Sequence, residues 1–163
     1  MDAARALSLA LILALVLFWI LKLKYAMGAV ISLLHDVIIT IGLFSLFDKE
    51  FSLPIIAAIL SIMGYSLNDT IIVFDRIREN LKKHSKNPFI STINKSVNET
   101  LSRTILTSST SLVAVLALFI LGGGIIHDFA FAMLVGILTG TYSSVYVASP
   151  ILLAWQDVAK RSK

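Results

Sequence analysis

The segment LPIIAAILSIMGYSLNDTIIVF, residues 53–74, holds a single charged side chain, Asp69, in an otherwise uncharged and mostly apolar run. A helix of about 20 apolar residues crosses the roughly 30 Å hydrocarbon core of a bilayer. The segment therefore predicts a membrane-spanning helix. Similar apolar runs cover residues 6–21, 26–47, 105–121 and 129–154. Together these runs predict an all-α membrane protein, a bundle of five transmembrane helices.

The composition leaves room for little besides these spans. Of 163 residues, 57% are hydrophobic and 15% are charged, and the mean hydropathy is +0.88, far above that of a typical soluble domain. We expect one membrane domain over residues 1–163, with residues 75–103 as its long cytoplasmic loop. The chain has no Cys, which excludes disulfides, thiolate metal sites and a thiol nucleophile.

The basic residues are distributed very unevenly along the chain. Short loops on the cytoplasmic side retain Lys and Arg, and all of the 14 basic residues except Arg5 and Lys49 fall on one side of the predicted bundle. The N-terminus is therefore expected outside and the C-terminus in the cytoplasm. A secretory leader carries its positive charge before the apolar run, and here the order is reversed. We therefore expect an upstream first span and an external domain to precede this region.

Two segments outside the regular spans have features of their own. Pro88 is typical of a helix start, and Ile90, Ile93, Val97 and Leu101 then recur on one helical face. The pattern predicts an amphipathic helix on the membrane surface; the alternative is a solvated linker. Near the chain's end Pro150, which lacks an N–H, predicts a kink or irregular end in the last span.

Asp69 and Arg103 are the first candidates for function, because charge in the hydrocarbon is costly and therefore indicates a role. At a rise of 1.5 Å per residue, Asp69 lies about 9 Å and Arg103 about 14 Å from the bilayer midplane. A long Arg side chain covers such a difference in depth. Paired with Arg103, Asp69 would stay ionised; desolvated and alone, it would take up a proton. The pair is then a proton switch, or else a static ion pair, or Arg103 only reaches the lipid headgroups.

Polar neighbours surround this pair in sequence. Ser66, Asn68 and Thr70 flank Asp69, and Thr107 lies one turn beyond Arg103. Each must find a hydrogen-bond partner at membrane depth, so they are candidates for supporting roles or for helix packing.

Asp36 is a third buried-charge candidate, about midway through the second span beside His35. It shares a face with Thr40, whereas His35 is expected to point elsewhere, which disfavours a metal site. Asp36 is either a relay residue or a packing residue, and packing is the expected role of His35. In the last span, Gly136 and Gly140 form a small-xxx-small pattern that indicates close helix packing.

Motifs for catalysis are missing from the sequence. It contains no phosphate-binding Gly-rich loop, no His-Glu-x-x-His and no Gly-x-Ser-x-Gly. We expect no enzyme activity, metal or cofactor. Topology and attraction to anionic lipid account for the basic residues, so membrane lipid is expected as a partner and nucleic acid is not.

Several stretches resemble one family closely. They are Leu33-Leu-His-Asp36, Gly64-Tyr-Ser-Leu-Asn-Asp-Thr70, Val73-Phe-Asp-Arg-Ile-Arg-Glu-Asn80, Leu101-Ser-Arg-Thr104, Gly140-Thr-Tyr-Ser-Ser144 and Ala148-Ser-Pro150. They resemble the SecF branch of the SecD/SecF family, within the resistance–nodulation–division superfamily. The resemblance covers nearly the whole chain. The parts of the family that it does not include are the first span and the periplasmic domain, which precede this region in family members.

The resemblance implies a function. Such proteins are multi-pass proteins of the bacterial inner membrane that use the proton-motive force to aid preprotein export, with SecD and the SecYEG channel as partners. Asp69 and Arg103 match the family's proton-transport pair. Two alternatives stay open: a proton-coupled exporter half for small molecules or lipids, and a scaffold whose buried charges only fix assembly.

Overall fold

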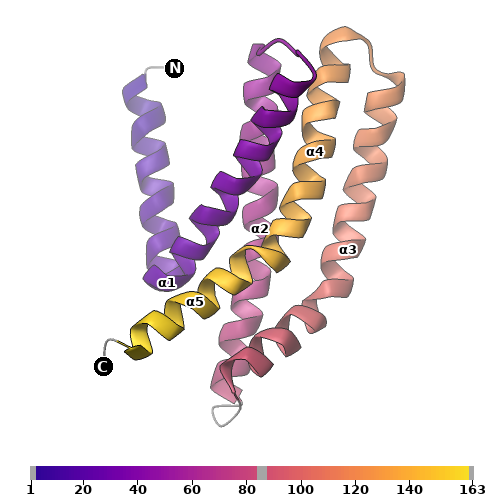
Figure 1. Cartoon of the computed structure of the whole chain (residues 1–163). Coiled ribbons are helices and arrows are strands. Elements are labelled where there is room, and N and C mark those ends of the chain that lie inside the picture. Colours follow the sequence, from indigo (N-terminus) through magenta and orange to yellow (C-terminus); the bar gives the residue numbers. More distant parts are fainter. Residues whose placement is uncertain (1–2, 84–87, 162–163) are drawn as a thin grey trace.

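The computed structural model describes residues 3–83 and 88–161, with side chains described for residues 25–83 and 88–156. Every regular element in this part of the chain is a helix. In chain order they are α1 (Ala3–Leu46), α2 (Leu53–Lys83), α3 (Phe89–Leu121), α4 (Gly124–Tyr146) and α5 (Ala148–Arg161). Figure 1 shows α2, α3, α4 and the second part of α1, Tyr25–Leu46, as a bundle. Helix α5 leaves the end of α4 at a slant and runs toward the side where α1 bends.

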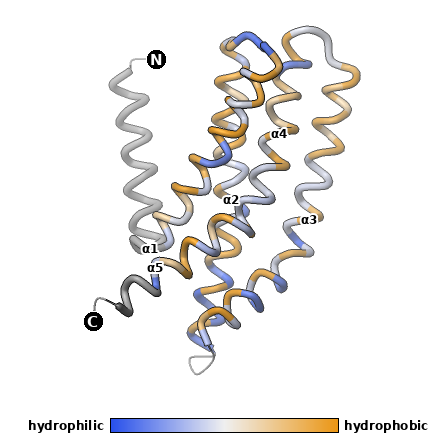
Figure 2. Tube along the Cα trace, viewed as in Figure 1, coloured by the Kyte–Doolittle hydropathy of each residue, from blue (hydrophilic) through white to orange (hydrophobic). Residues whose placement is uncertain are grey.

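Four helical stretches are long and apolar enough to cross a membrane: Tyr25–Leu46, Leu53–Lys83, Phe89–Leu121 and Gly124–Gln156. They contain four of the five predicted spans. The remaining one, residues 6–21, lies outside the residues whose side chains are described. Figure 2 shows hydrophilic residues at the two ends of the described bundle, with mostly apolar helices between them that carry paler and blue stretches near their middle.

The first two predicted spans are not separate helices. They belong to a single helix, α1, which runs from Ala3 to Leu46 and is sharply bent (Figure 1). No Gly or Pro stands between the two apolar runs, and the Lys and Leu residues there are good helix formers. The chain therefore changes direction without leaving the helix.

The predicted cytoplasmic loop is also mostly helical, because α2 continues to Lys83 and α3 already begins at Phe89. Pro88, expected as the first helical residue, is instead the N-cap of α3, with φ −56° and ψ 140°, so the helix begins one residue later than expected. The predicted amphipathic helix exists, but as the start of α3 and without a break before the span. Ile93 is buried and Val97 packs against the same core, so this face is apolar as expected.

The predicted irregularity near Pro150 divides the last span into α4 and α5. Pro150 has no N–H to donate to the carbonyl of Tyr146, and its ring crowds that carbonyl. Helix α4 accordingly ends at Tyr146, and Val147 leaves regular helix geometry with φ −111° and ψ −56°. Backbone bonding resumes where the N–H of Ile151 donates to the carbonyl of Val147.

The core has three layers stacked along the helices. One apolar layer, the Phe44 cluster, comprises Phe44, Ile55, Ala58, Ile62 and Ala132. At the other end lies the Phe74 cluster, comprising Tyr25, Ala29, Val73, Phe74, Ile77, Ile93, Ala148 and Leu152. A polar layer lies between these two clusters along α1, α2 and α4. Its members are the buried Ser32, Asp36, Thr40, Ser66, Asp69, Thr70, Ser143 and Ser144. The two apolar layers therefore shield the polar layer from both ends.

The two glycines of the small-xxx-small pattern lie where α4 approaches α2 closely. A Cβ added at Gly136 would overlap the side chain of Ile62, and one added at Gly140 would lie 3.1 Å from Cβ of Ser66. The predicted packing role of these glycines is therefore confirmed.

Candidate functional site

Asp69 lies in the polar layer on α2 and is 2% exposed. Its Oδ2 is buried and has no hydrogen-bond partner among the described residues. Buried polar atoms are usually paired, and a carboxylate without donors is costly at membrane depth. Asp69 is thus a carboxyl group whose proton occupancy is free to respond to its surroundings.

Arg103 lies on α3 with its side chain exposed. Neither a hydrogen bond nor an ion pair joins it to Asp69 in the described part of the chain, but its positive charge is close enough to act on the Asp69 carboxyl group. The structure therefore brings the two groups near one another without direct contact.

An open hollow of about 360 Å³ lies beside Arg103. Its lining residues are Ile72, Asp75, Arg76, Glu79, Glu99, Thr100 and Arg103. Ile72, the apolar residue in this lining, follows Asp69 by about one helical turn, so Asp69 lies about one turn deeper in the bundle than the hollow. This arrangement suits transfer of a proton between the hollow and a buried carboxyl group.

The ion pairs around this hollow connect α2 to α3. Nε of Arg76 donates to Oε2 of Glu99 at 2.6 Å, and Nδ2 of Asn80 donates to the same oxygen at 2.8 Å. Arg76 also pairs with Glu79 within α2. Arg103 takes no part in these pairs, so its guanidinium is not committed to the neighbouring carboxylates.

The predicted supporting residues near Asp69 and Arg103 differ in their burial and in their hydrogen bonds. Thr70 is buried beside Asp69, and Thr104 is buried beside Arg103; neither Oγ1 has a hydrogen-bond partner among the described residues. Asn68 is exposed, and Thr107 only donates back to carbonyls of its own helix, those of Arg103 and Thr104. Thr104 was not among the predicted residues, although its place beside Arg103 could have indicated it.

Ser66 does not serve Asp69 but a second buried carboxylate, that of Asp36 on α1. Oδ2 of Asp36 accepts hydrogen bonds from the hydroxyls of Ser66 at 2.6 Å and Ser143 at 2.8 Å. Nδ1 of His35 lies 3.0 Å from the other carboxylate oxygen, Oδ1. The expectation that His35 points elsewhere is therefore wrong: the flexible His and Asp side chains turn toward each other although they are adjacent in sequence.

Metal binding has no support in the described residues. Within residues 25–83 and 88–156, no group of three or more His, Cys, Asp and Glu side chains could hold a metal ion.

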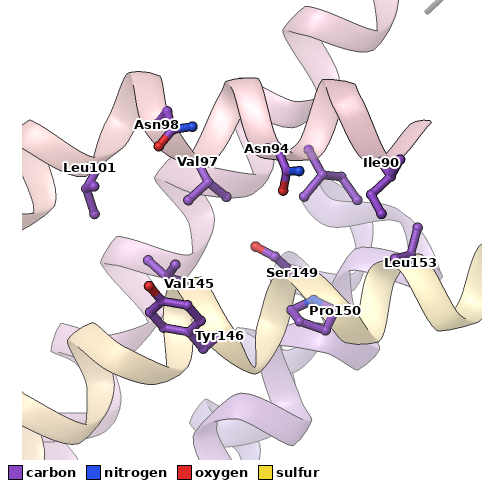
Figure 3. A pocket seen from close by; sticks show the side chains of 11 residues that line it. Ile90, Asn94, Val97, Asn98, Leu101, Val145, Tyr146, Ser149, Pro150 and Leu153 are labelled. Carbon is purple, nitrogen blue, oxygen red and sulfur yellow. The ribbon is translucent and has the colours of Figure 1, made fainter. Parts of the chain in front are cut away.

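A groove of about 340 Å³ separates the start of α3 from the α4–α5 junction. Figure 3 shows Asn94 and Val97 of α3 facing Val145, Ser149 and Pro150 across it. The groove is mainly apolar, and it uses the face predicted for the amphipathic helix.

The fold and these buried groups define a class: a multi-pass helical membrane protein with ionisable side chains enclosed between its helices. Comparison with known proteins then shows the family. Residues 1–158 match the family described as "Protein export membrane protein SecD/SecF, C-terminal". The chain belongs to the SecD/SecF family.

Relatives and solved structures agree with this assignment. The protein translocase subunit SecF of Desulfurispirillum indicum is 56% identical over 143 residues, which cover 86% of this chain and 46% of that protein. The subunit SecDF of Thermus thermophilus is 49% identical over 136 residues, 83% of this chain and 18% of that protein. A crystal structure of SecDF in a super-membrane-facing form superposes with a TM-score of 0.88 at 45% identity, covering 93% of this chain and 21% of that one. The chain therefore spans less than half the length of these relatives.

Proposed function

We propose that the chain is the transmembrane part of an accessory subunit of the Sec preprotein translocase that couples the proton-motive force to protein export. Its place is the bacterial inner membrane, with SecD and the SecYEG channel as partners, a preprotein as cargo and lipid around the bundle. In the full-length protein a first span and a periplasmic domain would precede this region. The proposal assigns no catalysed reaction to the chain.

One observation carries the proposal: Asp69 is buried, its Oδ2 is unpaired, and the charge of Arg103 lies nearby without contact. A static ion pair would instead hold the two groups together. Family membership adds that relatives at 49–56% identity are named as protein translocase subunits.

The mechanism follows from the two states of the Asp69 carboxyl group. Ionised, it attracts the guanidinium of Arg103 and draws α3 toward α2; protonated, it loses that attraction. Each proton that crosses a potential of 100 mV releases about 2.3 kcal/mol. Coupling energies between protein sites are typically about 1–3 kcal/mol. One proton is therefore enough to drive a shift of α2 against α3, which the partner subunits would transmit.

The test uses the full-length protein with its partners in vesicles that carry a proton gradient. Asp69→Asn keeps the side chain's size and removes the titration. We expect it to abolish the proton-driven part of export while the protein still inserts. The matched control is Asp48→Asn, because Asp48 is exposed at the end of the bundle opposite the hollow and its positive φ of 51° is one that Asn also adopts. Full stimulation in the Asp69→Asn variant would refute the mechanism.

A double variant separates the proton switch from a scaffold. Asp69→Asn combined with Arg103→Gln removes both charges at similar size. If the charges only fixed assembly, this neutral pair would restore export that either single change had lowered. The proposed mechanism predicts that proton-driven export stays lost, measured as preprotein protected inside the vesicles.

A further inference from the structure

Asp36 is the most completely bonded ionisable side chain in the polar layer. It is 0% exposed, and its partners come from three helices: His35 of α1, Ser66 of α2 and Ser143 of α4. Ser32 of α1 donates in turn to the hydroxyl of Ser143 at 3.0 Å. The carboxylate is therefore the point where three spans are joined by hydrogen bonds.

Both oxygens of the Asp36 carboxyl group have partners. The hydroxyls of Ser66 and Ser143 donate to Oδ2, and Nδ1 of His35 lies at hydrogen-bond distance from Oδ1. Buried polar groups are costly when they lose a partner. These contacts therefore hold the carboxyl group, and the helices that reach it, in one arrangement.

The packing around Asp36 is close, which leaves little room for α2 and α4 to shift relative to one another. A Cβ added at Gly140 of α4 would lie 3.1 Å from Cβ of Ser66 and 3.6 Å from Oδ2 of Asp36. Ser66 precedes Asp69 by less than one turn on α2. Whatever fixes Ser66 therefore also fixes the height and rotation of Asp69.

The charged and titratable groups near Asp36 are few. His35 faces it from α1, and its side chain is 30% exposed. On α2 the titratable residues nearest to Ser66 are Tyr65, whose hydroxyl donates to Ser108 of α3, and Asp69. The α4 segment beside it contributes hydroxyl groups, and its nearest titratable side chain, Tyr142, is 57% exposed.

We propose that Asp36 is a positioning residue whose carboxyl group holds α2 and α4 against α1 and so sets the place of Asp69. The inference rests on the proposed function, since it concerns the helix that carries the proton-binding group.

The first test measures stability and uses the full-length protein with its partner. Ser66→Ala and Ser143→Ala each remove one of the two hydroxyl donors to Asp36. We expect each change to lower the thermal unfolding midpoint, because a buried carboxyl group loses a partner. The matched control is Ser61→Ala, since the Ser61 hydroxyl only donates to the carbonyl of Ala57 on the exposed side of α2.

The second test measures position. Nitroxide labels at Ile38 of α1 and Leu60 of α2, which are 67% and 63% exposed, report the distance between these helices. We expect Asp36→Asn to broaden or shift the distance distribution and to lower proton-driven export by about tenfold or more, the effect of losing roughly one charged hydrogen bond. Ser61→Ala should leave both unchanged. If Asp36→Asn fails to insert, Ser66→Ala and Ser143→Ala replace it in the same measurement.

The outcomes separate the two proposals. An unfolding midpoint in Ser66→Ala and Ser143→Ala equal to that of Ser61→Ala, or an unaltered distance distribution in Asp36→Asn, would overturn the role of Asp36. Full export by Asp69→Asn would instead overturn the proposed function, while the unfolding and distance results, which require no export, would still decide the inference about Asp36.

Discussion

Asp36 and Asp69 are the same residue type in the same polar layer, but their carboxyl groups have opposite surroundings. Asp36 accepts two hydroxyl hydrogen bonds at Oδ2, whereas Oδ2 of Asp69 has no partner among the described residues. Asp36 is therefore held by contacts from three helices, whereas one oxygen of Asp69 is left without a donor in the described part of the chain.

Arg103 should matter for transport but not for stability. Its side chain is exposed and makes no ion pair with Asp69. Exposed substitutions away from special contacts usually change stability by about 0.5 kcal/mol or less. We expect Arg103→Gln to leave the thermal unfolding midpoint in detergent nearly unchanged and to remove most proton-driven export. A large fall in the unfolding midpoint would show that Arg103 is mainly structural.

Among the helices, the contact between α2 and α4 depends on Gly136 lying against Ile62. Gly136→Ala should destabilise the bundle by about 1–3 kcal/mol, the usual effect of overpacking a tight contact. Gly64→Ala is the control, because nothing lies within 4 Å of a Cβ added there. Both changes give the same gain in helix propensity. Equal stability of the two variants in reversible unfolding in detergent–lipid micelles would contradict the close contact.

Helix ends were predictable from sequence only where Pro or Gly marks them. Pro88 and Pro150 each indicated a boundary, and the structure has one within a few residues of each. Where helix-forming residues link two apolar runs, as between the runs of α1, hydropathy predicted a break that the backbone does not make. Hydropathy measures which residues enter the membrane, whereas continuity of a helix depends on local backbone preference.

The candidate site was predictable only in part. Charged residues are rare in and beside apolar membrane segments, and this rarity indicated Asp69, Arg103 and Asp36 directly. Ser143 and Thr104 were hidden among many small hydroxyl residues, and only the packing of distant helices shows which of these face a carboxylate. The partner of Ser66 was likewise undetermined until α1 and α2 were seen together.

For the whole molecule, the order of layers explains how buried carboxyl groups can exist inside a stable bundle. The Phe44 and Phe74 clusters enclose the polar layer from both ends, so its hydrogen bonds act in a medium of low dielectric constant. The hollow at the α2–α3 end is lined by Ile72, one turn from Asp69 along α2. Under the proposed function, this hollow is the route by which Asp69 would exchange a proton with water.

The direction of that exchange depends on which end of the bundle faces the cytoplasm. Basic residues gather at the end where α2 meets α3, which predicts that this end is cytoplasmic. Because the chain contains no Cys, a single introduced Cys reports its own side in a background without other thiols. In intact cells we expect Leu121→Cys, 84% exposed at the opposite end, to react with a membrane-impermeant maleimide. Lys82→Cys, exposed at the α2–α3 end, should react only in inverted vesicles. With the hollow on the cytoplasmic side, inward proton flow would discharge Asp69 through it; the reverse labelling pattern would place the hollow outside and make it the side from which Asp69 is loaded.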